Sequence, residues 1–386
     1  MVYNDGMHHF IPAFFLVACA GPSIDPTPSD DTSPLLADPE LGRFIAERMS
    51  KARVPGLSAA LVSDGEVLAV GAWGLANVEE DRRADTGTLF NLASVSKTIV
   101  SISASLLVED GALDLDADVN DYLPFAVDHP RSSKAITTRM LLTHSSGISD
   151  NWDVLESLYV SGDSPIALGD FLEDYLVAGG QYYDPQLNYD AGPGQAADYS
   201  NVASSLAAYV VESVSGTPFD AFCEARIFEP LGMDATGWHL SDIDTTQLAM
   251  PYGWERGEWS PYGFYGYPDY PDGQLRTSAP QLARVLAMVS AGGVYDGERL
   301  LSEASVEALL TPQIPNLEET QGLIWYSWEL GDDTVWGHNR GDDGVATEIL
   351  FRRSDGAGVV LLMNGDGDRW GPVEEIEQEL LGLAGG

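Results

Sequence analysis

Short apolar segments near both ends of the chain predict a β-sheet that is built from the two termini. Five segments have the length and the β-branched or aliphatic content of buried strands. They are 57–62, 67–71, 334–338, 347–351 and 358–364. Ser63-Asp64-Gly65-Glu66 separates the first two segments, which is the pattern of a β-hairpin, and the last three predict an antiparallel meander.

Helical spacing of apolar residues predicts helices at both ends of the chain and throughout its middle third. The expected helices are 39–52, 136–147, 166–177, 203–214, 219–228 and 373–383. Strands at both termini with helices between them indicate an α+β fold: an antiparallel sheet flanked by terminal helices, with a mainly helical inserted subdomain. We expect one domain over 39–386. Its sheet subdomain would take about 39–105 and 280–386, and its helical subdomain about 106–279.

The first residues predict export. The apolar run 10–18 is too short to span a membrane and ends in Leu16-Val17-Ala18-Cys19, which resembles the lipobox of bacterial lipoprotein signal peptides. The resemblance implies a signal peptide over 1–19 and lipidation of Cys19. The protein would then be anchored in the cell envelope, on the periplasmic or extracellular face of a bacterial membrane. Residues 20–38, rich in Pro, Ser, Asp and Thr, predict a flexible linker.

The composition excludes several kinds of partner. The chain of 386 residues has 60 Asp and Glu against 19 Lys and Arg, a formal net charge of −41. Such a charge repels phosphate backbones, so nucleic acid is not an expected partner, and a membrane is expected only through the lipid anchor. The sequence contains no H-E-x-x-H, paired C-x-x-C or Gly-rich phosphate loop, so neither a metal nor a cofactor is implied. Composition does not decide the oligomeric state.

Ser94 and Lys97 are the first candidates for chemistry. They lie one turn apart at the start of an apolar helix that continues through residues 99–108. Burial at that place is expected to lower the pKa of Lys97, which could then accept the proton of the Ser94 hydroxyl. The pattern S-x-x-K on its own is more typical of a serine cap beside a lysine that extends to solvent. Other motifs are needed to choose between these interpretations.

Two downstream motifs change the interpretation. Tyr199-Ser200-Asn201 precedes a predicted helix, and His338-Asn339-Arg340-Gly341 ends a predicted strand. S-x-x-K, Y-x-N and a basic residue on a late strand, in this order, resemble class C β-lactamases and the related D,D-peptidases, D-aminopeptidases and carboxylesterases. These are together the β-lactamase-related serine hydrolases. Family-like phrases extend over about 39–364, among them LLTHSSG at 141–147, PLGM at 230–233 and GHNRGDDGVATEILF at 337–351.

The resemblance implies a role for each matching residue. Ser94 would attack an acyl carbon, Lys97 would take or relay its proton, and Tyr199 would be the partner base and proton shuttle. The backbone N–H groups of Ser94 and Gly341 would form the oxyanion hole. The Asn201 side chain would bind the substrate.

The third motif departs from the β-lactamase pattern. His338 stands in the place of the Lys of K-T-G, as in the esterase and peptidase branches, and Arg340 replaces a glycine. Three interpretations of Arg340 are open. It points away from the site, it narrows the cleft and disables turnover, or it binds a substrate carboxylate through its guanidinium group.

We therefore predict a serine hydrolase that forms an acyl-enzyme on Ser94 and cleaves a small ester, amide or peptide. Esters and D-amino-acid peptides rank above β-lactams because of His338 and Arg340. The alternative prediction is a catalytically impaired protein of the same fold that binds penicillin or peptidoglycan, or serves as a scaffold. His144, in a Ser-rich turn, is expected to be a structural hydrogen-bonding residue.

Overall fold

A seven-stranded antiparallel sheet forms the centre of the molecule. The computed structural model describes residues 22–366 and 371–386. The strands, in spatial order, are β12 (Tyr326–Leu330), β13 (Asp333–Asp342), β14 (Val345–Arg352), β15 (Gly358–Met363), β1 (Gly56–Ser63), β2 (Glu66–Asn77) and β3 (Arg82–Arg83). The pairing of β1 with β15 joins the two ends of the chain, with Leu57 opposite Met363. The predicted α+β fold class is therefore confirmed.

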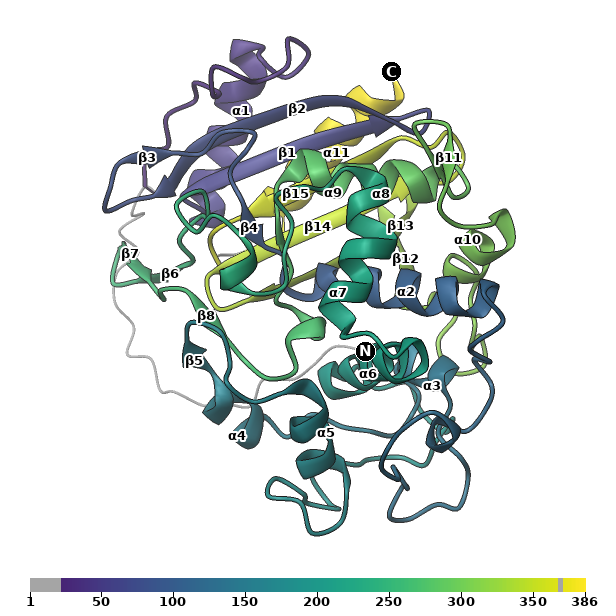
Figure 1. The fold of residues 1–386 in the computed structure, drawn as a ribbon. Helices are drawn as coiled ribbons and strands as arrows, with labels where there is room; N and C mark the ends of the chain where they lie inside the picture. Colours follow the sequence, from purple (N-terminus) through teal and green to yellow (C-terminus); the bar gives the residue numbers. More distant parts are fainter. Residues whose placement is uncertain (1–21, 367–370) are drawn as a thin grey trace.

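Each face of the sheet is covered by helices. Alternate residues of a strand point to opposite faces, so β1 contributes to two hydrophobic cores. Leu57 and Leu61 pack with the terminal helices α1 (Pro39–Ala52) and α11 (Pro372–Gly385). Ala60 and Val62 belong to the larger core that contains α9 (Ala279–Ser290) and the helical part. In Figure 1, α1 and α11 lie along the upper side of the sheet and the helical part lies below it.

The helical part is organised around one buried helix, α2 (Lys97–Glu109), which contacts α6, α7 and α10. The remaining helices are α3 (Thr138–Leu142), α4 (Trp152–Leu155), α5 (Leu168–Leu176), α6 (Asn201–Ser215), α7 (Phe219–Cys223), α8 (Glu229–Leu231) and α10 (Glu303–Leu309). Four short strand pairs connect these elements: β4 (Phe90–Asn91) with β9 (Arg276–Thr277), β5 (Val160–Ser161) with β8 (Tyr265–Gly266), β6 (Tyr252–Glu255) with β7 (Glu258–Pro261), and β10 (Val294–Tyr295) with β11 (Glu298–Arg299).

Most predicted elements are present. The hairpin of β1 and β2 turns at Asp64 and Gly65, both with positive φ (52° and 75°), as a two-residue turn requires. The three C-terminal strands and the two terminal helices are confirmed. The helix predicted over 136–147 is only the short α3, which begins after the cap Thr137. Strand β12 was not among the predicted strands, although its sequence Tyr-Ser-Trp-Glu-Leu alternates between apolar and polar residues as an edge strand does.

The prediction of a flexible linker over 20–38 is wrong for the residues that the structure describes. Ser29 donates a backbone hydrogen bond to Ala72 in β2 and Ser33 donates one to Val70, so this segment lies along the edge of β2. Leu36 is fully buried against the terminal helices. These contacts satisfy backbone groups that a free tether would leave to water.

The N-terminal predictions lie outside the described residues. These are the signal peptide over 1–19 and the lipidation of Cys19. Within the described ranges, no helix is long and apolar enough to cross a membrane.

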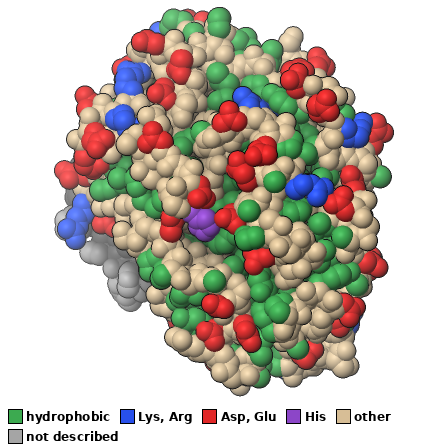
Figure 2. All heavy atoms as spheres, viewed as in Figure 1, with side chains coloured by type: hydrophobic (Ala, Val, Ile, Leu, Met, Phe, Trp, Pro, Cys, Tyr) green, Lys and Arg blue, Asp and Glu red, His purple; other side chains and the backbone are tan. Residues whose placement is uncertain are grey.

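Acidic side chains are spread over the face seen in Figure 2, with few basic ones among them.

Candidate active site

Ser94 lies on a tight turn that neighbouring segments hold in place. The helix expected to begin with Ser94 and Lys97 starts at Lys97, as α2, and Ala93–Ser96 before it form a 3₁₀ turn. Leu92 donates to the carbonyl of Leu275 at 2.8 Å and accepts from the Thr347 hydroxyl. Ala93 has φ 46°, a left-handed conformation that is costly for alanine and is typical of functional turns. The turn is thus fixed by two distant parts of the chain.

Lys97 is completely buried beside Ser94. Its Nζ lies 3.0 Å from Ser94 Oγ and 2.7 Å from the backbone oxygen of Asp272. The carboxylate of Asp272 is also near, with Oδ2 3.9 Å from Nζ. Ser94 is 9% exposed, so it is slightly more accessible to solvent than the fully buried Lys97.

The expectation of a lowered pKa for Lys97 is wrong in its net direction. Burial by itself lowers the pKa, as expected, but charge interactions with Tyr199 and Asp272 outweigh it and raise the pKa of Lys97 above its usual value. Sequence reasoning missed Asp272, which is 175 residues from Lys97 along the chain. No spacing rule connects positions that are so far apart.

Tyr199 is positioned by the segment that contains His144. The backbone oxygen of His144 accepts from Asp198 N at 2.7 Å, and its ring Nδ1 accepts from Ser200 N at 3.2 Å, so His144 holds both residues that flank Tyr199. Its backbone has φ 53°. The prediction that His144 is a structural hydrogen-bonding residue is confirmed.

Asp150 also holds the Tyr199-Ser200-Asn201 motif in place. Its carboxylate accepts from the Ser200 hydroxyl at 2.9 Å and from the backbone N–H groups of Asn201 and Val202 at 2.9 and 3.2 Å. These are the first residues of α6, where a carboxylate is favoured by free N–H groups and the helix dipole. The sequence carried no signal that singled out Asp150.

Three side chains surround the ring of Tyr199. The His144 ring is at 4.3 Å between centroids, Arg340 Cζ is 4.7 Å from the ring centroid, and Lys97 Nζ is 5.1 Å from it. A cation near an aromatic face is attracted by the ring quadrupole. The position of Arg340 over Tyr199 rules out the interpretation that it points away from the site.

The third motif, residues 338–341, lies in the part of β13 that has only one neighbouring strand. The pairing with β12 ends at Gly337, so residues 338–342 extend past that neighbour while they remain paired with β14. His338 is fully buried, with its ring 6.4 Å from that of Tyr199. Gly341, exposed on the same strand, is opposite Ala346. The side chain of Asn201 is 9% exposed and makes no hydrogen bond to a residue in the described part of the chain.

Burial and positive neighbours keep both histidines neutral. For His144, burial first and then Lys97 and Arg340 lower the pKa to about 3. For His338, burial and Lys97 lower the pKa well below its usual value. Both rings are therefore neutral near pH 7. The two ring nitrogens of His338 are buried and have no hydrogen-bond partner among the described residues.

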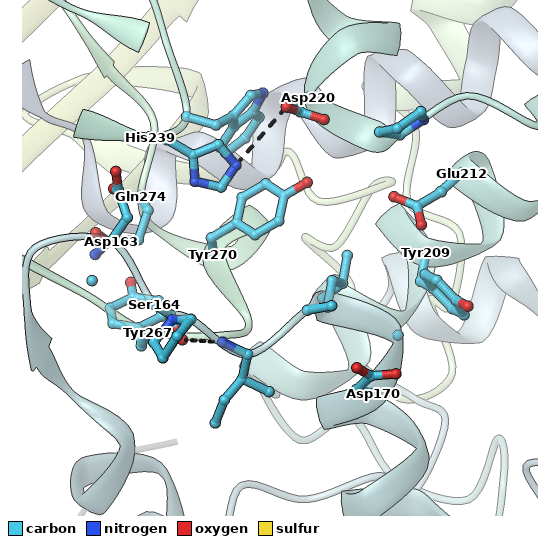
Figure 3. A pocket seen from close by; sticks show the side chains of 18 of the residues that line it. Asp163, Ser164, Asp170, Tyr209, Glu212, Asp220, His239, Tyr267, Tyr270 and Gln274 are labelled. Carbon is cyan, nitrogen blue, oxygen red and sulfur yellow. Dashed lines mark hydrogen bonds and ion pairs between the residues drawn. The ribbon is translucent and has the colours of Figure 1, made fainter. Parts of the chain in front are cut away.

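Two cavities lie near these residues. One, of about 570 Å³, is lined by His144, Tyr199, His338 and Arg340 together with residues 318–330. The other, of about 440 Å³, contains none of the predicted site residues. Figure 3 shows Tyr267, Tyr270 and Gln274 on its wall, and the segment that carries them also supplies Asp272 to Lys97.

The fold and the site define a class of protein. Three features are typical of the β-lactamase and transpeptidase type of serine hydrolase. They are an antiparallel sheet covered by terminal helices, a helical insert, and a serine in contact with a buried lysine that lies beside a tyrosine. The family model described as "Beta-lactamase" matches residues 41–383. The chain belongs to this family, which confirms the resemblance found in the sequence.

Similar proteins have several activities. Esterase EstB of Burkholderia gladioli is 33% identical over 60% of this chain, and the match covers 58% of the esterase. Penicillin-binding protein 4 of Amycolatopsis lactamdurans is 28% identical, with 89% of each chain covered. A penicillin-binding protein structure from Bacillus halodurans has a TM-score of 0.70 at 25% identity, covering 87% of this chain and 98% of that one. The D-amino acid amidase of Ochrobactrum anthropi shares the fold, with a TM-score of 0.69 at 22% identity and coverage of 89% and 99%.

Proposed function

We propose that this protein is a serine hydrolase that cleaves a small ester or amide through an acyl-enzyme on Ser94. The observation that carries the proposal is the 3.0 Å contact between Ser94 Oγ and the buried Lys97 Nζ, with Tyr199 beside the lysine. The Ser94 hydroxyl is next to a lysine that itself lies beside a tyrosine, and either a neutral amine or a phenolate can take its proton as it attacks. Lys97 and Tyr199 form the proton-transfer pair of this mechanism.

The other proposed roles belong mainly to residues at the end of β13. The oxyanion of the tetrahedral intermediate would be bound by the backbone N–H groups of Ser94 and Gly341, each of which can be worth about 10²–10³ in kcat. Neutral His338 would donate to or accept from the substrate. An esterase or a D-amino-acid peptidase is favoured over a β-lactamase because a neutral histidine replaces the lysine cation of K-T-G.

The test is covalent labelling, read by intact-mass spectrometry. A fluorophosphonate should add one adduct to the wild type and none to Ser94→Ala, and a p-nitrophenyl ester should turn over only with the wild type. Ser101→Ala is a matched control, because Ser101 lies on the same helix and its hydroxyl donates only to Thr98 O. An adduct on Ser94→Ala, or no adduct on the folded wild type, contradicts the proposal.

The labelling also separates the alternative function. A penicillin adduct that persists without turnover of any ester would favour a penicillin-binding protein that is impaired in hydrolysis. The observation that favours this alternative is the guanidinium of Arg340 over Tyr199. Hydrolysis of the ester or release of the penicillin excludes it.

We further propose that the protein is exported and anchored by a lipid on Cys19. The support is the sequence Leu16-Val17-Ala18-Cys19 after an apolar run. Expression in bacteria with an alkyne-labelled fatty acid should label the wild type and leave Cys19→Ala unlabelled. Equal labelling of both, or of neither, contradicts the anchor.

A further inference from the structure

A buried carboxylate beside Lys97 has no part in the mechanism described so far. Asp272 is 6% exposed, and its Oδ2 lies 3.9 Å from Lys97 Nζ. Its backbone oxygen accepts from the same Nζ at 2.7 Å. Its other carboxylate oxygen, Oδ1, is buried without a hydrogen-bond partner in the described ranges. A buried carboxylate is costly unless a positive charge or donors compensate it.

Lys97 is the only cation within ion-pair distance of Asp272 in the part of the chain that the structure describes. The other groups facing this place are acids, phenols or neutral rings from several elements. They are Tyr267 and Asp269 in the same segment, Asp150 before α4, Tyr199 before α6, and His338 and Asp342 on β13. Tyr267 donates to Asp342 Oδ2 at 3.2 Å. Burial raises the pKa of Asp272 to about 7, and the charge of Lys97 is the largest contribution that lowers it, followed by a hydrogen bond from Tyr267. Lys97 is therefore the cation that favours the charged form of Asp272.

The segment that carries Asp272 is held rigidly against the nucleophile turn. Leu275 donates to Ser96 Oγ at 3.2 Å and accepts from Leu92 N at 2.8 Å. A side chain at Gly273 would collide with the Tyr267 hydroxyl, so the segment fits closely at this point. The distance between Asp272 and Lys97 is thus set by the fold rather than by the free rotation of a surface side chain.

We propose that Asp272 is the counter-ion of Lys97 and keeps it protonated in the resting enzyme, so that Lys97 enters the reaction as an ammonium group. In that form Lys97 donates to Ser94 Oγ and to Asp272 O. It cannot be the first acceptor of the Ser94 proton, which passes instead to the oxygen of Tyr199 acting as a phenolate beside the ammonium. Asp272 is a positioning residue, because it acts through Lys97. Only the kinetic consequence of this inference rests on the proposed function.

The direct test uses the three lysines of the chain, Lys51, Lys97 and Lys134. Protein labelled with ¹³C at lysine Cε should give three NMR signals, which single Lys→Arg variants assign. We expect Asp272→Asn to weaken proton binding at Lys97 by at least about tenfold, because it removes a negative charge a few ångströms away. Glu212→Gln is the matched control: Glu212 is a half-buried carboxylate on the wall of the second cavity, seen in Figure 3, and should leave the Lys97 titration unchanged.

An unchanged Lys97 titration in folded Asp272→Asn would overturn the proposal. If that variant does not fold, the wild type decides. Burial alone would make Lys97 titrate at a lower pH than the two surface lysines, whereas the counter-ion makes it titrate at a higher pH. A lower midpoint for Lys97 in the wild type overturns the proposal even if no substrate is ever hydrolysed, so its failure and that of the proposed function are distinguishable.

The rate of fluorophosphonate labelling gives a kinetic readout. If Lys97 reacts as an ammonium, Asp272→Asn should lose labelling rate at alkaline pH relative to pH 7, because its Lys97 loses the proton earlier. If neutral Lys97 were the base, the same variant would label faster at pH 7, and that result overturns the proposal. The ratio of rates at two pH values is unaffected by a uniform loss of active protein.

Discussion

Arg340 is the position at which the structure makes the sharpest prediction about substrates. Many arginines of this acidic chain form ion pairs with carboxylates at 2.6–2.9 Å; among them are Arg48, Arg139, Arg226, Arg352 and Arg353. Arg340 is exposed, and its guanidinium lies over the Tyr199 ring, with Cζ 4.7 Å from the ring centroid. Arg340→Gly removes this charge and restores the residue typical of the family.

The expected effect depends on the charge of the substrate. A hydrogen bond to a charged group contributes about 1.5–3 kcal/mol when it is protected from water, and an exposed ion pair contributes about 0.2–1 kcal/mol. Arg340 is exposed on one side and faces the Tyr199 ring on the other, so we expect about 1–2 kcal/mol, or roughly 5–30-fold in kcat/KM. Only a substrate with a carboxylate should lose this amount.

The assay compares a p-nitrophenyl ester with its ω-carboxylate analogue of equal chain length. Arg340→Gly should lower kcat/KM for the anionic ester selectively, and Arg340→Lys should retain part of the preference because it keeps the charge. Added salt should reduce the preference of the wild type. An equal change for both esters refutes the carboxylate-binding role, and faster turnover of the neutral ester by Arg340→Gly would show that the arginine obstructs the cleft.

Three further predictions follow from buried groups. Asp150→Asn should leave at least one buried N–H group of α6 unpaired and lower the unfolding free energy by about 1–3 kcal/mol in urea denaturation; an unchanged midpoint contradicts this. Burial raises the pKa of Cys223 to about 12, so iodoacetamide should modify Cys223 only after unfolding. His144 and His338 should be neutral at pH 5 by ring-nitrogen NMR. Because unfolded histidine binds a proton below about pH 6.5, the stability that each neutral ring contributes is present above that pH and is lost by about 1.4 kcal/mol per pH unit below it; a charged ring at pH 5 contradicts the prediction.

Local pattern was sufficient for the elements that have a continuous apolar run or a regular helical spacing of apolar residues. The β1–β2 hairpin, the C-terminal meander and the terminal helices all follow from periodicity and turn residues, because each buries apolar side chains at a spacing set by its own backbone. The alternation of β12 also indicated a strand, although it was not among those predicted. Local pattern failed for residues 22–38, whose polar composition did not reveal their backbone pairing with β2.

The sequence alone determined the fold class, the family and the candidates Ser94, Lys97 and Tyr199, because these depend on residue types at short spacings and on the order of motifs. Only the tertiary structure decided how the candidates interact. It placed Asp272 at Lys97, Asp150 at the start of α6 and Arg340 over Tyr199. These contacts join segments far apart in the chain, and burial and charge act through distance in space. That is also why the shift in the pKa of Lys97 could not be inferred from its own helix.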